Sequence, residues 1–377
     1  MNNKFRVLYH IIKNETVLFI SLTAAILTMF FVPPTAAYIS YLNLRVLALL
    51  FCLMAVVAGF QKTGLFLLMA DKLFQRATTV RSLSFILILL CFFSSMWITN
   101  DVALITFVPF AIMVLTIAKQ RNYIIRIIVL QTIAANLGSM LTPIGNPQNL
   151  YLYMKYDISI INFLKITFPY TAVSFVLLFI CILLIKKEPL ASVMTSKSEA
   201  DALKTSLIIL YGLLFIISLA CVLRLLDYRI TFILVLSVIF LFDRSILKRI
   251  DYCLLLTFIC FFIFVGNIGQ IEVIKDFLAE LITGRELFVA ILSSQIISNV
   301  PAAALLSAFT SQYKAILLGT DIGGLGTLIA SLASLISYKF YCRTEDAKPG
   351  RYLLLFTGYN LAFLFVLCIL CFISNLL

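Results

Sequence analysis

The chain has 377 residues, of which 63% are hydrophobic and 12% are charged, and its net charge is +12. A soluble domain has about 45–50% apolar and about 25% charged residues, so this composition excludes a soluble globular protein. Several apolar segments reach or approach the roughly 20 residues that cross a bilayer: Val17–Val32, Leu44–Phe60, Phe163–Ile185, Ser206–Val222, Leu254–Gly266 and Leu353–Ile373. The sequence therefore predicts an all-α polytopic membrane protein with about 10–11 membrane segments.

The positive charge is unevenly distributed along the chain. If the N-terminus is cytoplasmic, most of the 29 Lys and Arg residues lie in segments on that side: Lys62 to Arg81, Lys119 to Arg126, Lys186 to Lys204, Arg244 to Arg249 and Lys339 to Arg351. Cytoplasmic loops of membrane proteins have such an excess of basic residues. This pattern predicts a multi-pass protein of the plasma or inner membrane with a cytoplasmic N-terminus. It accounts for the positive net charge, so we expect no nucleic-acid partner.

The first unusual segment is residues 83–119, which is too long for one helix yet is flanked by basic residues at both ends. Its middle is polar: Ser94, Ser95, Thr99, Asn100 and Asp101. Both facts predict a re-entrant helical hairpin, which enters the membrane and returns to the same side. A short amphipathic stretch, Gly64–Arg76, precedes it and has enough charge to lie at the membrane interface.

The next segment, residues 121–155, is predicted to be a broken helix. It contains "LGSMLTPIGNPQN", where Gly138 and Gly145 permit unusual backbone and two prolines prevent a continuous helix. Thr142 and Asn146 supply polar oxygens. Non-helical backbone at membrane depth persists only where it lines a cavity or is buried in protein, so the break predicts a binding site.

The same order of elements recurs after the linker 186–204. An amphipathic stretch, Ile271–Thr283, precedes a second predicted hairpin, 287–312, with its tip at Ser298–Val300. A second broken helix, 314–340, contains "LGTDIGGLGTLIAS". Aligned on Leu-Gly, the two breaks pair Gly138 with Gly319, Ser139 with Thr320, and Gly145 with Gly326. Residues 1–190 and 205–377 are thus predicted to be two inverted repeats, an arrangement in which secondary transporters build a site at the membrane midplane.

Asp101 and Asp321 are the acidic residues within these core motifs. A carboxylate at this depth is costly and usually marks an ion or proton path, although each could instead cap a half-helix. Thr320 and the backbone from Gly319 to Gly324 offer oxygens nearby, so sodium and a proton would compete for the carboxylate. Asn100 and Asn299 occupy equivalent places at the two tips, which suggests substrate contact, with satisfaction of the local backbone as the alternative.

The four motifs together resemble the ion-transporter superfamily, which includes divalent-anion:sodium symporters, citrate-transporter-like permeases, arsenite permeases and a class of sodium/proton antiporters. The resemblance rests on "TNDVALITFVP", "SNVPAAALLS", "ANLGSMLTPIGNPQN" and "GTDIGGLGT". It implies an elevator-type transporter, commonly a homodimer, with two cation sites and a substrate between the tips. It also implies that Asn100 and Asn299 contact substrate, with Thr99 and Ser298 beside them, and that the Gly138 and Gly319 carbonyls coordinate cations.

The tips differ from the Ser-Asn-Thr of dicarboxylate symporters, since they end in Asp101 and Val300. We therefore expect a secondary active transporter that couples sodium or proton movement to a small organic or inorganic anion, with no cofactor. The alternatives are a sodium/proton antiporter and an arsenite-like efflux permease. A membrane-embedded hydrolase is a more remote alternative, because a serine hydrolase needs a histidine base and His10 is the sole histidine. We therefore expect the protein not to be an enzyme.

The candidate residues form two groups. The expected substrate-binding residues are Thr99, Asn100, Ser298, Asn299, Thr142, Asn146 and Thr327. The expected cation-binding residues, with sodium as the metal, are Asp101, Gly138, Ser139, Gly319, Thr320, Asp321 and Gly324.

Overall fold

The structure, a computed structural model, describes residues 16–35, 38–65, 77–190 and 205–374. Within these ranges the chain consists of helices joined by loops, with one isolated β-bridge between Thr79 and Pro189. The prediction of an all-α polytopic membrane protein is confirmed. Most of the predicted amphipathic stretch Gly64–Arg76 and of the linker 186–204 lies outside the described residues.

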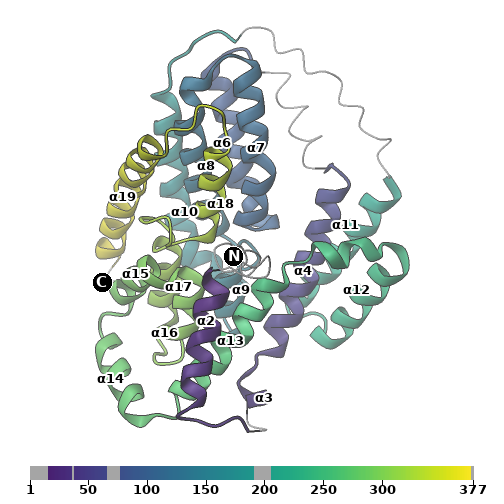
Figure 1. Ribbon diagram of the computed structural model, residues 1–377, viewed down its shortest axis with the longest axis vertical. Coiled ribbons are helices and arrows are strands. Elements are labelled where there is room, and N and C mark those ends of the chain that lie inside the picture. Colours follow the sequence, from purple (N-terminus) through teal and green to yellow (C-terminus); the bar gives the residue numbers. More distant parts are fainter. Residues whose placement is uncertain (1–15, 36–37, 66–76, 191–204, 375–377) are drawn as a thin grey trace, which may run out of the picture.

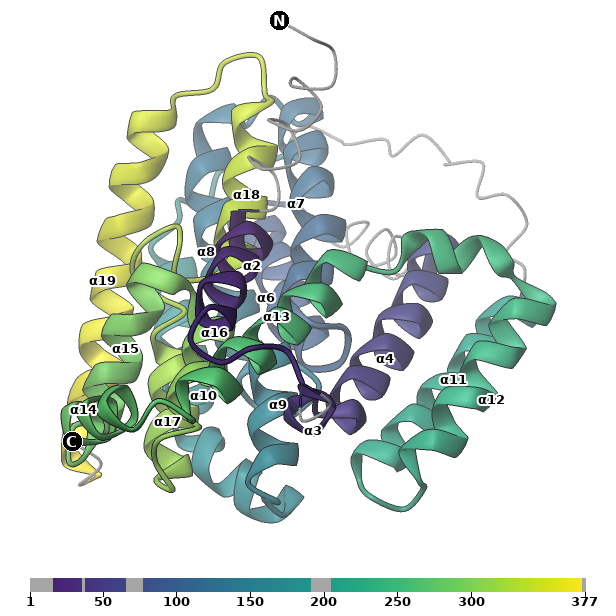
Figure 2. The ribbon, with the colours of Figure 1, turned by 60° about the horizontal axis from the view of Figure 1, so that its bottom comes forward.

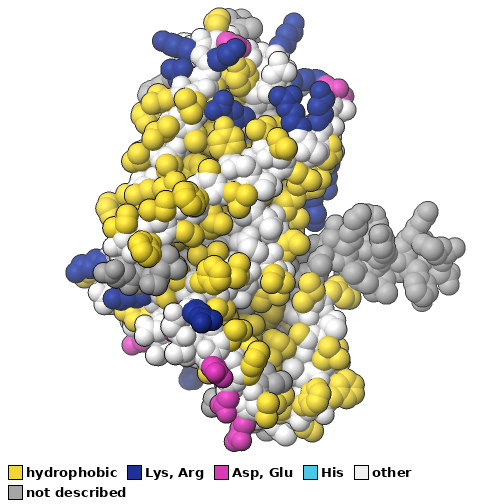
Figure 3. All heavy atoms as spheres, turned by 90° about the vertical axis from the view of Figure 1, so that its left-hand side faces the viewer, with side chains coloured by type: hydrophobic (Ala, Val, Ile, Leu, Met, Phe, Trp, Pro, Cys, Tyr) yellow, Lys and Arg dark blue, Asp and Glu magenta, His cyan; other side chains and the backbone are white. Residues whose placement is uncertain are grey.

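The helices are, in chain order, α2 (Thr16–Met29), α3 (Tyr38–Tyr41), α4 (Leu44–Lys62), α6 (Val80–Ile98), α7 (Asn100–Ile117), η1 (Arg121–Tyr123), α8 (Ile124–Ser139), α9 (Pro147–Lys155), α10 (Ile160–Leu183), α11 (Thr205–Val222), α12 (Tyr228–Phe242), η2 (Arg244–Arg249), α13 (Tyr252–Ile268), α14 (Glu272–Ile282), α15 (Glu286–Ile297), α16 (Asn299–Leu306), α17 (Tyr313–Ile322), α18 (Leu332–Cys342) and α19 (Pro349–Ile373). Five of them, among the described residues, are long and apolar enough to cross a membrane: α4, α6, α7, α10 and α19. One face of the molecule shows a broad hydrophobic middle, and its largest gathering of Lys and Arg side chains lies at the upper end (Figure 3).

Two pairs of helices form hairpins with a single residue at each tip. α6 and α7 pack against each other in the upper part of the molecule, and α15 and α16 do so in the lower part (Figure 1). α6 begins with a capping box, in which the Thr79 and Ser82 side chains satisfy each other's backbone N–H groups. Thr99 separates α6 from α7, and Ser298 separates α15 from α16.

Two further pairs form broken helices. α8 ends at Ser139, and α9 begins at Pro147 after a loop. The Asn146 side chain caps α9 by accepting a hydrogen bond from the Asn149 N–H, and proline at the first helical position favours the same boundary. α17 ends at Ile322, and α18 begins after a loop of glycine and small residues. Most residues of both breaks are buried, although Thr327 and Ile329 of the second are exposed, so most of this backbone is shielded from lipid.

α4, α11 and α12 form a separate group at one edge of the molecule, away from the bundle that contains α6, α7, α8 and α18 (Figure 2). The Lys62 ammonium at the end of α4 lies 2.8 Å from the Asp243 carboxylate after α12. The Tyr211 hydroxyl of α11 donates to the same carboxylate at 2.8 Å. α4 also contacts α9 and α13, so this group borders the first helix break.

Candidate functional site

The two hairpin tips have the same backbone conformation. Thr99 has φ 70° and ψ 151°, and Ser298 has φ 73° and ψ 154°. Residues other than glycine rarely adopt this conformation, which costs on the order of 1–3 kcal/mol and persists only where the surroundings enforce it. At each tip the next residue is an asparagine whose Oδ1 accepts a hydrogen bond from the following backbone N–H, at 2.9 Å from Asp101 and 3.0 Å from Val300.

Each tip docks onto the break in its own half of the chain. The Asn100 N–H donates to the Gly145 carbonyl at 3.1 Å, in the loop between α8 and α9. The Asn299 N–H donates to the Ala330 carbonyl at 3.0 Å, in the loop between α17 and α18. The strained tip conformation thus aims the first N–H of α7 and of α16 at a loop carbonyl.

A pair of threonines makes a second matching contact. The Thr142 hydroxyl donates to the Met96 carbonyl near the end of α6. The Thr327 hydroxyl donates to the Gln295 carbonyl near the end of α15, at 3.2 Å. Thr142 therefore corresponds to Thr327, and Met96 corresponds to Gln295.

These contacts correct the alignment of the two breaks. The tip contacts match Gly145 with Ala330, and the same register matches Gly138 with Gly323. The Leu-Gly alignment paired Gly138 with Gly319 and Gly145 with Gly326, about one helical turn away. That register is wrong, because the hydrogen bonds to the hairpins, rather than the Leu-Gly dipeptide, define the equivalent positions.

Asn136 connects the first tip to the second broken helix. Its Oδ1 accepts hydrogen bonds from the Asn100 amide at 3.0 Å and from the Ser331 hydroxyl at 3.1 Å. Its own amide donates to the Ser334 hydroxyl at 3.5 Å. Ser331 and Ser334 belong to the start of α18, so Asn136 joins the first half of the chain to the second.

Asp321 makes the reciprocal connection. It lies in the last turn of α17, and only 2% of the residue is exposed. The Asn149 side-chain amide of α9 is oriented so that its nitrogen donates to both carboxylate oxygens of Asp321, at 2.9 and 3.2 Å. Both polar atoms of the neighbouring Gln148 side chain lack a hydrogen-bond partner, although the residue is buried.

Asn136 and Asp321 occupy equivalent positions in the corrected register. Asn136 contacts the first turn of α18, and Asp321 contacts the first turn of α9. A polar side chain from each half of the chain therefore forms hydrogen bonds with the broken helix of the other half. The chemical difference is that one connection is made by a neutral amide and the other by a carboxylate.

The other expected cation ligands already have hydrogen-bond partners. The Ser139 hydroxyl and the Thr320 hydroxyl each donate to a carbonyl about one turn earlier, at 2.8 Å. The Gly319 carbonyl accepts from the N–H four residues later at 2.8 Å, and the Gly324 N–H donates to the carbonyl three residues earlier at 3.2 Å. Gly138 packs closely on α6, since a Cβ there would lie 2.1 Å from a backbone oxygen of that helix.

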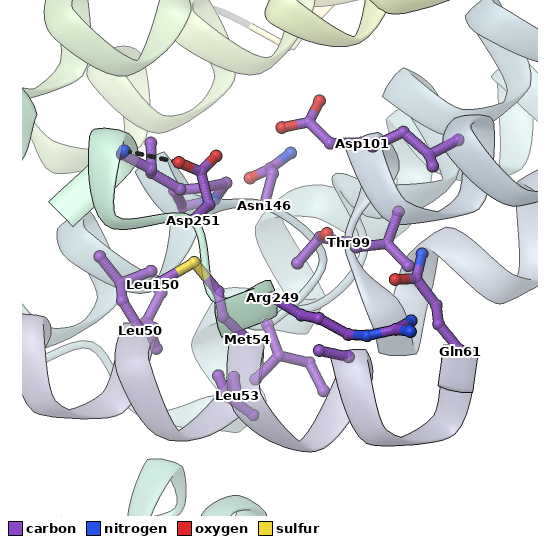
Figure 4. A pocket seen from close by; sticks show the side chains of 16 residues that line it. Leu50, Leu53, Met54, Gln61, Thr99, Asp101, Asn146, Leu150, Arg249 and Asp251 are labelled. Carbon is purple, nitrogen blue, oxygen red and sulfur yellow. Dashed lines mark hydrogen bonds between the residues drawn. The ribbon is translucent and has the colours of Figure 1, made fainter. Parts of the chain in front are cut away.

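A cavity of about 150 Å³ lies between the first break and the group formed by α4 and the η2–α13 connection. Its apolar walls come mainly from α4, α7 and α9. Its polar lining consists of Gln61, Thr99, Asp101, Asn146, Arg249 and Asp251. Figure 4 shows Asp101, Asn146 and Asp251 along one side and the Arg249 side chain extending toward Gln61 on the other.

The charged residues of this cavity differ in how they are held. Asp101 Oδ1 is buried without a hydrogen-bond partner, and Asp101 lies in the first turn of α7, where the helix N-terminus favours a carboxylate. Asp251 Oδ1 accepts from the Leu254 N–H at 2.9 Å and caps α13. Arg249 is exposed to the cavity, and it is the basic residue among the described residues that line it.

The cavity brings together some of the expected residues and not others. Thr99, Asp101 and Asn146 line it. The rest of the expected substrate-binding and cation-binding residues do not: Asn100, Gly138, Ser139 and Thr142 belong to the first tip and break, and Ser298, Asn299, Gly319, Thr320, Asp321, Gly324 and Thr327 belong to the second half. Of the latter, Thr327 is exposed.

Sequence reasoning missed several residues. In the sequence Arg249 is one basic residue of the segment Arg244 to Arg249, and no local pattern indicates a cavity there. Asn136 lies within an apolar helix, where an amide is a usable signal, and Gln295 belongs with Ser293 and Ser294 to the polar middle of the second predicted hairpin, where the sequence alone assigns it no role. Asn149 belongs to the "NPQN" motif of the first half of the chain, but it contacts Asp321 of the second half. No local sequence pattern in either half predicts this contact.

Comparison with known proteins gives one consistent result. The profile of a family described as citrate transporter (CitMHS) matches residues 8–333. The chain is 35% identical over 273 residues to the uncharacterized transporter MJ0456 of Methanocaldococcus jannaschii, covering 71% of this chain and 73% of that one. It is 30% identical over 297 residues to the inner membrane protein YbiR of Escherichia coli, covering 76% and 77%. It is also 35% identical over 130 residues to the silicon efflux transporter LSI3 of Oryza sativa, covering 34% and 26%.

The profile match spans most of the chain, and the two prokaryotic relatives align over about three quarters of it. The chain is therefore a multi-pass membrane transporter, and it belongs to the citrate transporter family.

Proposed function

We propose that this chain is a secondary active transporter that moves a small anion coupled to sodium or protons, and that it is not an enzyme. The observation that supports this best is the cavity between the first helix break and α4. A hairpin tip, a helix N-terminus and a basic side chain meet there in a space of about 150 Å³, which suits a small solute. The N-terminus of α9 and Arg249 both favour negative charge.

The electrostatics of the cavity support cation coupling. Among the described residues, its lining has one basic residue, Arg249, and two acidic residues, Asp101 and Asp251. An anion that enters such a site adds a negative charge to a net negative surface of low dielectric, which is unfavourable unless a cation or proton enters as well. The unpartnered oxygen of Asp101 is a suitable place for that cation. Coupling then follows from charge neutralisation.

An elevator-type movement agrees with the way the helices are joined. The hairpins and breaks of both halves are linked by the hydrogen bonds of Asn136 and Asp321, which favours their moving as one body. The group of α4, α11 and α12 lies on the other side of the cavity and would remain fixed. On this proposal the fixed group also forms the homodimer contact, and the repeats have opposite orientations with the N-terminus in the cytoplasm.

The transport proposal is tested with purified protein in liposomes. We expect saturable counterflow of one member of a panel of citrate, succinate, phosphate, arsenite and silicic acid, dependent on sodium or on a pH gradient. Arg249→Gln should raise the apparent KM about ten- to a hundredfold, since a hydrogen bond to a charged group contributes roughly 1.5–3 kcal/mol. Arg244→Gln is the matched control, because Arg244 is exposed on the same short helix and lies over Phe240 instead. Equal kinetics for both variants would refute the substrate role of Arg249.

The orientation of the repeats is tested separately in cells. Arg81→Cys lies at the base of the first hairpin, and Gln312→Cys lies just after the second. An impermeant thiol reagent should label Gln312→Cys from outside and should reach Arg81→Cys only after the membrane is opened. Labelling of both positions from one side would refute the inverted arrangement.

A second candidate function is efflux of a small neutral hydroxylated acid. With two acidic residues and one basic residue among the described lining residues, the cavity is less suited to a multivalent anion than to a neutral solute that forms hydrogen bonds. One relative is named as a silicon efflux transporter. Counterflow of silicic acid or arsenite without citrate transport would favour this candidate.

A further inference from the structure

The two helix breaks, equivalent in backbone contacts, differ in what fills them. In the second break the Gln295 amide donates to the Gly323 carbonyl at 2.8 Å, to the Leu325 carbonyl at 2.9 Å and to the Ile291 carbonyl at 3.2 Å. Its Oε1 accepts from the Thr327 N–H at 2.9 Å. One side chain therefore satisfies two carbonyls and one N–H of the interrupted helix.

The loop is shaped around this side chain. Gly326 has φ +111°, and a Cβ at that position would lie 2.3 Å from Gln295 Oε1. The Thr327 hydroxyl also donates to the Gln295 backbone carbonyl. A larger residue at Gly326 would displace the amide, so the glycine and the glutamine form one unit.

The first break has no such filling. The residue that corresponds to Gln295 is Met96, an apolar side chain that cannot donate a hydrogen bond to the loop carbonyls. The corresponding carbonyls are those of Gly138, which accepts the Leu141 N–H at 3.1 Å, and of Met140. In the orientation of Asn149 that satisfies its contacts with Asp321, its amide is directed to that carboxylate and not to the Met140 carbonyl.

The N–H groups of an amide that point at carbonyl oxygens place positive charge beside them, as a hard cation such as sodium would. Cations of this kind bind sets of carbonyl, carboxylate and hydroxyl oxygens. In the second break those oxygens are already engaged: the Gly319, Asp321 and Ile322 carbonyls accept backbone N–H groups, and the Gly323 and Leu325 carbonyls accept from Gln295. The residues of this break do not fit a sodium ion.

We infer that the Gln295 amide is a fixed substitute for a cation, so that the second break holds no cation and the coupling cation binds at the first break alone. This inference rests on the proposed cation-coupled transport and deepens it, because it limits the number of cations per chain to one. Permanent filling also explains how the second break stays folded at membrane depth without an ion.

The experiment is a measurement of sodium bound per chain, made on the purified full-length protein by equilibrium binding of radioactive sodium. Gln295→Glu replaces the donor by a carboxylate oxygen that repels the two carbonyls unless a cation lies between them. We expect this variant to bind one sodium ion more than the wild type, and its thermal unfolding midpoint to rise with sodium concentration. Met96→Gln is the reciprocal variant of nearly equal size, and it should remove a sodium ion that the first break binds.

The outcomes separate this inference from the proposed function. A wild-type protein that binds one sodium ion, or none with proton coupling, supports the inference if Gln295→Glu gains one. Two sodium ions in the wild type, or no gain in Gln295→Glu, would overturn it. If Gln295→Glu does not fold even in sodium, Gln295→Met, which copies the first break, must gain the ion. Binding is measured without any transported substrate, so a failure of liposome counterflow would overturn the proposed function and leave this result standing.

Discussion

The tight contact between α6 and α8 gives a quantitative prediction for Gly138→Ala. A Cβ at this position would lie 2.1 Å from the Phe92 carbonyl oxygen and 2.7 Å from the Ser95 hydroxyl oxygen, whereas ordinary contacts are 3.4–4 Å. The nearest obstacle is backbone and cannot rotate away, so the two helices must separate by about 1 Å at their crossing. Overpacking of a core costs typically about 1–3 kcal/mol, and a rigid obstacle favours the upper end of that range.

Gly358→Ala is the matched control, because a Cβ there meets nothing within 4 Å and the residue lies inside α19. Alanine is the better helix former by about 1 kcal/mol, so this variant should be neutral or stabilised. The two variants should thus differ by about 3 kcal/mol, or on the order of 5 °C in unfolding midpoint for a chain of this size. A thiol-reactive dye is a suitable probe, since several free cysteines, such as Cys91, are buried until the protein unfolds. Midpoints that agree within about 1 °C would refute the close approach of α6 and α8.

Three further predictions use the same preparation. Thr99→Gly and Ser298→Gly should each leave the free energy of unfolding unchanged or raise it by up to about 1–2 kcal/mol, because glycine relieves the positive φ; a loss with either would contradict the strain at the tips. Burial raises the pKa of Asp243, but its hydrogen bonds and the charge of Lys62 outweigh burial and lower the pKa from 3.8 to about 2. This carboxylate therefore stabilises the fold above about pH 4 and loses that effect as the pH falls toward 2, so the stability lost in Asp243→Asn should shrink over that range. Asp321→Asn should fold, yet it should weaken the cation dependence of transport, and counterflow with wild-type sodium and pH dependence would show that the carboxylate is only structural.

Local signals allowed much of the fold to be predicted. Asn100 in an apolar stretch indicates a hairpin tip, and the structure separates α6 from α7 at the residue before it. Asn146 followed by Pro147 indicates a helix start, and α9 begins there with that cap. Such signals work because capping, proline and chain polarity act within a few residues.

The chemistry of the site was harder to predict, because it depends on contacts between distant segments. Arg249 reaches the cavity only through the packing of α4 against α9 and α13, and in the sequence it is one basic residue among several. The alignment of the breaks was wrong by about one turn, because a Leu-Gly dipeptide recurs in each half without occupying an equivalent place. The contact of Asn149 with Asp321 joins opposite halves, and neither segment alone indicates it.

A repeated backbone with unequal side chains is what the proposed coupling of two solutes would need. Matching hydrogen bonds at both tips and both breaks give the halves equal geometry, which the proposed movement between two equivalent states would require. If the side chains matched as well, both breaks would bind the same cation. The chain differs at three equivalent pairs, Asn136 with Asp321, Met96 with Gln295 and Asp101 with Val300, and in each pair the difference lies in charge or hydrogen bonding. Asp321 directs its carboxylate to α9, beside the break where Met96 offers no amide donor, while the Gln295 amide donates to the carbonyls of the other break. These differences therefore favour cation binding on the same side of the pseudo-symmetric pair, the side that borders the cavity.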